Sequence, residues 1–276
     1  MSDIHLVEHR AMATTFQVRI ANEEKSYAAQ AAQAAFGVMV DLESHLSRFR
    51  ASSDISQIAH LAPGEQLRVS EPTFACLDIA KKMEVATGGA FSATPAALKT
   101  QPAMPRWSLI PAEFSVRCDR GRLEFDLGAI GKGFALDRMA AVLSDWDCPA
   151  FLLVAGGSSI LAGNPPTGNA GWSCGLGDDN SPQRYWLANC SLSGSGLTVK
   201  GQHIFDPRTG QVAQRESRAW ALTDTAAESD ALSTAAMVLN KNEITGVLTR
   251  DKSWLVFLHE MESWRSLGSR ALPARA

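Results

Sequence analysis

Apolar and polar residues alternate along residues 15–20, and this period of two predicts a strand with one face exposed to water. Residues 151–155 form a continuous apolar run, which is typical of a strand buried on both faces. Apolar residues recur instead at helical spacing through residues 32–46 and again through residues 133–146. The pattern therefore predicts strands and helices that are interspersed along the chain.

The middle of the chain is harder to interpret from its pattern. Residues 90–110 contain three prolines and lack a sustained period, which predicts an ordered loop that wraps the body of the protein. Residues 114–118 and 122–127 are expected to pair as a hairpin. The other expected elements are strands near residues 172–176, 185–191, 218–222 and 254–258, an edge strand around Trp264, and helices after Ser70, from Ser229 and near residues 243–248.

The composition indicates how large the hydrophobic core can be and which class of binding partner can be excluded. The chain has 276 residues, 45% of them hydrophobic, which predicts a single domain over residues 1–276, built in one piece or as two intertwined subdomains. The net charge of −3 and the sequence pI near 6.1 argue against a nucleic-acid-binding protein, which normally carries a basic surface. Positively charged groups at the binding site itself would have to bind any anionic ligand.

The five cysteines are scattered and show no C-x-x-C spacing, so neither a disulfide framework nor a zinc site is indicated. The first ten residues carry several charges and do not have the form of a signal peptide. No later apolar run approaches the length of a membrane span. These features lead us to expect a cytoplasmic protein without a membrane span.

Residues 126–133, with the sequence DLGAIGKG, join a strand pattern to a helix pattern. Glycines let backbone N–H groups approach an anion, the helix start adds a positive dipole end, and Lys132 adds a full charge. The alternative is a tight turn with a solvated lysine. The stretch is neither a Walker loop, since Gly133 stands where Ser or Thr is needed, nor a G-x-G-x-x-G fingerprint. We interpret it as a candidate phosphate site.

His203 precedes a turn-forming stretch at residues 206–210. An imidazole can exchange protons near neutral pH, so His203 is a candidate catalytic acid or base. A lone histidine is also commonly structural, and the sequence leaves both interpretations open.

Asp230 and Thr234 are four residues apart in a predicted helix and so share one face. Mg²⁺ prefers one or two carboxylates, neutral oxygens and substrate phosphates, so this pair could hold that ion. In the alternative interpretation, Asp230 is a first-turn acid that satisfies the helix dipole, and Thr234 bonds back to its own helix.

Several motifs occur together in one order along most of the chain, and this order resembles the ApbE-type FAD:protein FMN transferase family. The resemblance implies an α+β fold with mixed, largely antiparallel sheets flanked by helices. The matching stretches are MAT at residues 12–14, LSRFR at 46–50, TGGAF at 87–91, DLGAIGKG at 126–133 with Asp137, AGG at 155–157, SG at 195–196, HIFDPRTG at 203–210 and DALST at 230–234.

The resemblance also implies an activity: Mg²⁺-dependent transfer of FMN from FAD to a Thr or Ser hydroxyl of an acceptor protein, with release of AMP. It implies that Asp230, Thr234 and the carbonyl of Ala129 hold the metal and that His203 moves a proton. The residues implied to bind FAD are Met12, Phe49, Ala90, Phe91, Ser92, Asp126, Lys132 and Ile204.

Five positions depart from the pattern of the family. Its members commonly have Gly at Ala13, Tyr at Phe49, Asn at Ala59, an acid at Ser92 and an acid or amide at Ser158. Ser92 matters most, because a short hydroxyl poorly replaces a carboxylate that accepts hydrogen bonds from a ring edge. We expect Ser92 to weaken flavin recognition and Ser92→Asp to restore it.

The departures leave two alternatives to protein flavinylation. One is a Mg²⁺-dependent FAD pyrophosphatase, in which water replaces the acceptor hydroxyl and the products are free FMN and AMP. The other is a non-catalytic flavin-binding protein that kept the fold.

Overall fold

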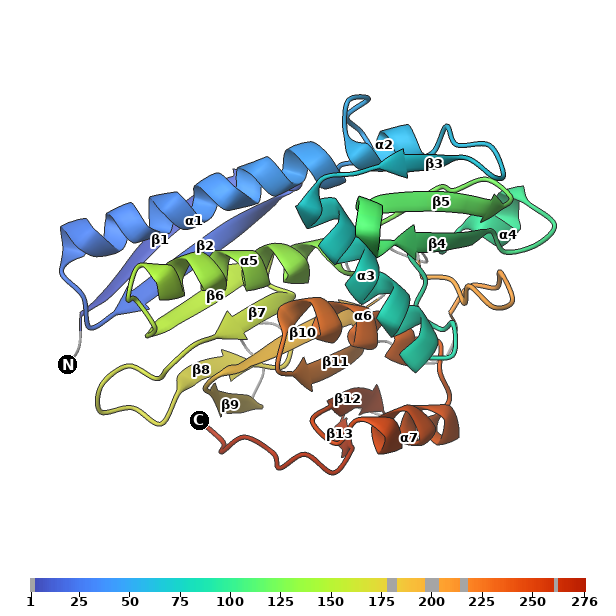
Figure 1. The fold of residues 1–276 in the computed structure, drawn as a ribbon. Helices are drawn as coiled ribbons and strands as arrows, with labels where there is room; N and C mark the ends of the chain where they lie inside the picture. The colour runs from blue at the N-terminus through green and yellow to red at the C-terminus, as the bar shows by residue number, and fades with distance from the viewer. Residues whose placement is uncertain (1–2, 178–182, 197–203, 214–217, 261–262) are drawn as a thin grey trace.

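The computed structural model describes residues 3–177, 183–196, 204–213, 218–260 and 263–276. An eight-stranded sheet forms its centre, with the strand order β1-β2-β6-β7-β10-β11-β12-β13 and antiparallel pairing between every neighbouring pair (Figure 1). The strands are β1 (Ile4–Ala11), β2 (Thr14–Ala21), β6 (Phe151–Ala155), β7 (Ser159–Ala162), β10 (Cys190–Gly196), β11 (Arg218–Thr223), β12 (Leu255–Glu260) and β13 (Ser263–Leu267).

Two smaller sheets and the helices complete the fold. The strands β3 (Gln66–Arg68), β5 (Ser115–Arg120) and β4 (Arg106–Ile110) form one small sheet, and β8 (Trp172–Gly175) pairs with β9 (Arg184–Leu187). The helices are α1 (Lys25–Leu46), α2 (Asp54–Ile58), α3 (Glu71–Ala86), α4 (Ala97–Thr100), α5 (Gly131–Asp145), α6 (Ala226–Ala236) and α7 (Lys241–Arg250), with a 3₁₀ turn at Pro111–Glu113. The expected α+β class with mixed, largely antiparallel sheets is confirmed.

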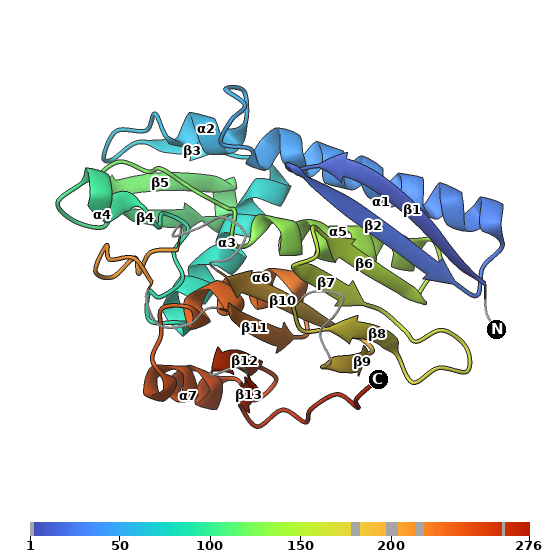
Figure 2. The same cartoon turned by 180° about the vertical axis from the view of Figure 1, so that it is seen from behind.

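The large sheet is buried on both faces near its middle. The helices α1, α5 and α6 pack on one face, over the larger apolar cluster, and the sheet lies in front of α1 and α5 when the molecule is turned around (Figure 2). The hairpin of β8 and β9 contributes Trp172 and Tyr185 to a second apolar cluster. Leu153 belongs to the first cluster and Leu152 to the second, which explains the continuous apolar run of β6.

None of the helices in the described residues is long and apolar enough to cross a membrane. Whether the chain forms one domain or two intertwined subdomains stays a prediction.

The expected hairpin of residues 114–118 and 122–127 is wrong in its second strand. The partners of β5 are β3 and β4, and β4 lies in the stretch that was expected to be a loop. Residues 122–127 are not a strand, because their backbone groups bond to side chains and loops: the N–H of Arg122 donates to Gln101, and that of Asp126 donates to the carbonyl of Ala93. Alternation alone does not reveal which partner a strand-like segment has.

The strand β1 was not expected from the sequence. Its residues are mostly exposed or half-buried, because it is the edge strand of the sheet, so its apolar pattern is weak. A two-residue turn, Met12-Ala13, joins it to β2, and both residues have positive φ, at 48° and 58°. Such a turn suits glycine, because a Cβ is strained in the left-handed region.

Replacing Ala13 by glycine should therefore stabilise the protein. The left-handed conformation costs a residue with a Cβ about 1–2 kcal/mol, and the extra entropy of glycine in the unfolded chain offsets about half of this. We expect a gain of about 0.5–1 kcal/mol in the free energy of unfolding, measured by urea titration. Ala21→Gly, in the extended part of the same hairpin, is the matched control and should destabilise; a loss in both variants would contradict the strain at Ala13.

Candidate functional site

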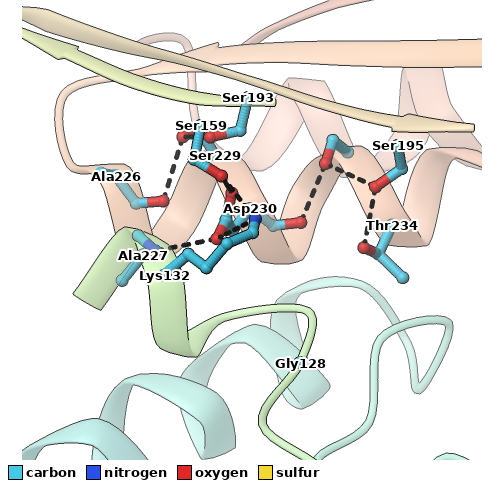
Figure 3. A network of polar contacts seen from close by, with 12 residues as sticks. Gly128, Lys132, Ser159, Ser193, Ser195, Ala226, Ala227, Ser229, Asp230 and Thr234 are labelled. Carbon is cyan, nitrogen blue, oxygen red and sulfur yellow. Dashed lines mark hydrogen bonds and ion pairs between the residues drawn. The ribbon is translucent and has the colours of Figure 1, made fainter. Parts of the chain in front are cut away.

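The carboxylate of Asp230 is the point at which three elements meet. It lies on α6 and is 4% exposed. Its Oδ2 accepts a hydrogen bond of 2.8 Å from the backbone N–H of Gly133, and its Oδ1 accepts one of 2.6 Å from the hydroxyl of Ser159 (Figure 3). The ammonium of Lys132 lies 3.5 Å from Oδ2. A buried carboxylate with these partners is held in one orientation.

Asp230 is the fifth residue of α6, so it is not the first-turn acid that the alternative interpretation required; that acid is Glu228. Lys132 does not point freely into solvent either, because its ammonium also donates to the hydroxyl of Ser159 at 2.6 Å. The structure thus brings Lys132 and Asp230 together from the starts of two helices.

The first two turns of α5 pack closely against the start of α6. The carboxylate of Asp137, on α5, accepts hydrogen bonds from the backbone N–H groups of Ala226 and Ala227 at 2.7 and 2.9 Å, and so caps α6. Burial raises the pKa of Asp137 to about 7. Gly133 faces the same backbone, and a Cβ built on it would overlap the carbonyl oxygen of Ala226. This close approach sets Lys132 beside Asp230.

Hydroxyl groups connect α6 to the sheet. Alternate residues of β10 point to one face, so Ser191, Ser193 and Ser195 all face the helix. Ser191 and Ser193 lie 2.7 and 2.8 Å from the hydroxyl of Ser229. The hydroxyl of Ser195 lies 3.0 Å from that of Thr234, which fixes Thr234 one turn beyond Asp230. Figure 3 shows the loop at Gly128 on the same side of α6 as Thr234.

A second set of contacts gathers three loops. The Nη1 of Arg48 lies 2.8 Å from Oδ2 of Asp126, and Oδ1 of Asp126 accepts from the backbone N–H of Gly128 at 2.9 Å. The backbone N–H of Asp126 donates to the carbonyl of Ala93 at 2.8 Å. Phe49 is 85% exposed, and the guanidinium of Arg48 lies 4.9 Å from the centre of its ring. Three of the segments expected around FAD, at residues 48–49, 90–93 and 126–128, are therefore neighbours.

The other expected residues take different environments. Ala90, Phe91, Ser92 and Ile204 are buried, Ala129 is half-buried, and the loop of residues 204–213 lies beside residues 89–98. Met12 is half-buried in the hairpin turn, and its backbone N–H donates to Glu43 at 2.9 Å. His203 lies outside the described residues.

A cavity of about 390 Å³ opens between α3, the loop after it and β4. Its wall includes Glu84, Phe91, Ser92, Trp107, Pro207 and Arg208. Ser92 does not point freely into this space, because its hydroxyl donates to Oε1 of Glu84 at 3.0 Å.

The sequence reasoning missed Ser159, Asp137 as a helix cap, and Glu84. The sequence does carry a signal for Ser159, because this residue follows the Gly-Gly turn after β6, next to Ser158. Glu84 carried no signal, because an acid on a helix surface is ordinary in a sequence.

The oxygen atoms near Asp230 suit a hard divalent cation. In the described residues, no group of three or more His, Cys, Asp or Glu side chains could hold a metal ion. The site instead offers one carboxylate and the neutral hydroxyl of Thr234 on the same helix face. Such a set fits Mg²⁺, which takes few protein carboxylates and keeps water and phosphate oxygens as ligands.

Comparisons with known proteins show the family and the fold to which this chain is similar. A family model described as "ApbE family" matches residues 12–257. Two curated proteins of Klebsiella pneumoniae (strain 342), each named FAD:protein FMN transferase, are 23% identical over 147 residues and 22% identical over 221 residues. The alignments cover 48% and 66% of this chain, and the chain spans 41% and 66% of the length of those relatives. The solved structure of the flavin transferase ApbE from Vibrio cholerae has a TM-score of 0.80 to this fold, with 18% identity over 98% of each chain.

Proposed function

The chain belongs to the ApbE family, and from this premise we propose that it transfers the FMN half of FAD to a Thr or Ser hydroxyl of an acceptor protein, releasing AMP. One observation carries the proposal: the buried carboxylate of Asp230 is paired with Lys132, which lies in the first turn of a helix that follows a glycine turn. A carboxylate that can hold a cation, a lysine and a helix start together suit a pyrophosphate.

Mg²⁺ would be held by Asp230, Thr234 and the carbonyl of Ala129, and it would supply positive charge that neutralises the pyrophosphate. Lys132 would bind the same phosphates, since its ammonium is already fixed beside Asp230. The glycine turn allows backbone N–H groups to approach the phosphate oxygens. We assign to these groups the positioning and charge stabilisation on which phosphoryl transfer mostly depends.

The nucleophile would come from the acceptor protein. Its hydroxyl oxygen forms a bond to the phosphorus of the FMN phosphate, while the bond from that phosphorus to the bridging oxygen breaks and AMP leaves. His203 is the proposed group that takes the hydroxyl proton. The chain therefore needs no catalytic serine of its own.

Met12, Phe49, Ala90, Phe91, Ser92, Asp126 and Ile204 are the proposed contacts to FAD. The ion pair of Arg48 with Asp126 and the bond from Asp126 to Ala93 support the part of this set that lies at residues 49, 90–92 and 126, because they bring those three loops together. Phe49 offers an exposed ring that can stack on a flavin.

Product analysis tests the proposal. The protein is incubated with FAD, Mg²⁺ and a protein extract from its source cells, and the products are separated under denaturing conditions. We expect flavin fluorescence that stays with a protein band, and AMP in equal amount. Free FMN with AMP would instead indicate hydrolysis, and no turnover would indicate flavin binding alone.

We predict that FAD binds at least about tenfold more tightly than FMN, because the site is placed for two phosphates and the adenine half adds contact. Titration that follows flavin fluorescence measures both affinities. Equal affinities would contradict a pyrophosphate site.

The same titration can assign the difference to Lys132. Lys132→Gln should reduce the preference for FAD, since it removes the charge beside the phosphates. Lys82→Gln is the matched control, because Lys82 is exposed on α3 and pairs with Asp78. An equal loss in the two variants would mean that general surface charge, and not the site, attracts FAD.

A further inference from the structure

The side chain of Glu84 lies at the wall of the cavity and is only 16% exposed. Its Oε1 accepts two hydrogen bonds of 3.0 Å, from the hydroxyl of Ser92 and from the backbone N–H of Ala93. Its Oε2 lies 3.3 Å from the ammonium of Lys81. These contacts come from the loop after α3 and from the preceding turn of α3, so the carboxylate is fixed in orientation.

A carboxylate has about four lone-pair positions. In the described part of the chain, the contacts with Ser92, Ala93 and Lys81 use three of them, two on Oε1 and one on Oε2. One acceptor position on Oε2 is therefore left for a donor in the cavity. Phe91 and Trp107 line the same wall but are only 1% and 4% exposed, and the ammonium of Lys81 lies 4.3 Å from the centre of the Trp107 ring. The cavity thus offers a carboxylate acceptor beside apolar side chains, which suits a small ring that carries a hydrogen-bond donor.

We propose that Glu84 recognises the exocyclic amine of the adenine half of FAD and so determines the specificity of the site for adenine. The inference rests on the proposed function, which supplies FAD as the ligand. The chemistry of the two ring systems favours adenine over the flavin. The pyrimidine edge of a flavin presents two carbonyl oxygens around one N–H, and a carboxylate repels those oxygens, whereas the amine of adenine carries two N–H donors and projects beyond the acceptor nitrogens of the ring on either side.

This role also accounts for Ser92. The family resemblance led to the expectation that Ser92 weakens recognition, because an acid is missing from the loop. In the structure, the hydroxyl of Ser92 donates to Glu84. The carboxylate of Glu84, which belongs to α3, therefore takes the place of an acid in the loop, and Ser92 orients it. An acid at position 92 would place a second negative charge against Glu84, which is unfavourable in a site that is mostly buried. We therefore expect Ser92→Asp to weaken binding of FAD.

Competition by two nucleotides tests the inference. AMP and IMP differ at the purine 6-position, where AMP has an amine and IMP has a carbonyl oxygen. Each is titrated against bound FAD, with flavin fluorescence as the readout. The affinity of the wild-type protein for AMP should be at least about tenfold higher than its affinity for IMP, since the carbonyl of IMP would face the carboxylate. Glu84→Gln should remove or reverse this preference, because its amide can donate to IMP, while the affinity for FMN stays unchanged.

Asp78→Asn is the matched control, because Asp78 is an acid on the same helix that pairs with a lysine on the exposed surface. It should keep the preference for AMP. If the wild-type protein binds FAD but binds AMP and IMP equally well, the role of Glu84 is overturned and the proposed transfer is left intact. A drop in FMN affinity in Glu84→Gln, with the AMP preference kept, would assign Glu84 to the flavin and overturn the inference. Failure of the wild-type protein to bind FAD would overturn the proposed function itself.

Ser92→Asp gives a second, independent test, which does not need the Glu84 variant to fold. Weaker binding of FAD by this single variant would support the inference. Tighter binding of FAD by Ser92→Asp would overturn the inference, because an acid at position 92 would then bind FAD better than Glu84 with Ser92 does.

Discussion

Replacing Asp230 by asparagine is expected to lower the Mg²⁺-dependent turnover of FAD about a hundredfold or more, since loss of a metal's charge stabilisation costs several kcal/mol in the transition state. Asparagine keeps the size of the side chain and removes its charge. Lys132 loses its ion-pair partner in the same change, so its position beside the phosphates is also weakened. Initial rates measured over a range of Mg²⁺ concentrations test this, with AMP as the product that is followed.

The structure predicts a second effect of Asp230→Asn. The carboxylate accepts from Gly133 and from Ser159, and the amide can satisfy only part of this pattern, because its nitrogen is a donor. A buried donor left without a partner costs about 1–3 kcal/mol, so the free energy of unfolding should also fall. Urea titration separates this loss of stability from the loss of activity.

Glu228→Gln is the matched control for Asp230→Asn. Glu228 is an acid in the first turn of the same helix and does not contact Lys132 or Ser159 in the described residues. We expect its turnover and its Mg²⁺ dependence to stay close to those of the unchanged protein. Full activity of Asp230→Asn at limiting Mg²⁺ would show that Asp230 only joins the two helices.

Gly133→Ala is expected to cost about 3 kcal/mol or more of stability, because overpacking against a rigid neighbour is at the upper end of such substitutions. The added Cβ would overlap the carbonyl of Ala226 and lie 2.7 Å from the backbone nitrogen of Ala227. These atoms cannot move away freely, since Asp137 caps the same turn through the N–H groups of both residues. The midpoint and slope of urea unfolding measure the effect.

Gly131→Ala is the control in the same helix. Among the described residues, its Cβ would meet only the Cβ of Leu127, at 3.7 Å, which is an ordinary contact. We expect a change within about 1 kcal/mol, and alanine is the better helix former. If Gly133→Ala unfolded at the same urea concentration as Gly131→Ala, the close approach of α5 and α6 would be wrong.

Some parts of the fold follow from local pattern alone. The run of residues 151–155 and the helical spacing of residues 133–146 correspond to β6 and α5, because burial on two faces and burial on one helix face leave different periods in a sequence. Residues 122–127 alternate as a strand does but do not form one. A segment becomes a strand only when a partner strand satisfies its backbone, and here Gln101 and Ala93 take that place.

The sequence alone shows which residue types could bind a phosphate and a cation: glycines let backbone N–H groups approach an anion, and Lys132, Asp230 and Thr234 carry a charge or an oxygen ligand in their side chains. It also determined the family, through the order of its motifs. Two features became visible only in the folded protein: Lys132 and Asp230 share the hydroxyl of Ser159, and Glu84 places a carboxylate beside Ser92. The reason is physical: Gly133 and Asp230 are 97 residues apart, and their hydrogen bond exists because α5 and α6 pack without a side chain between them.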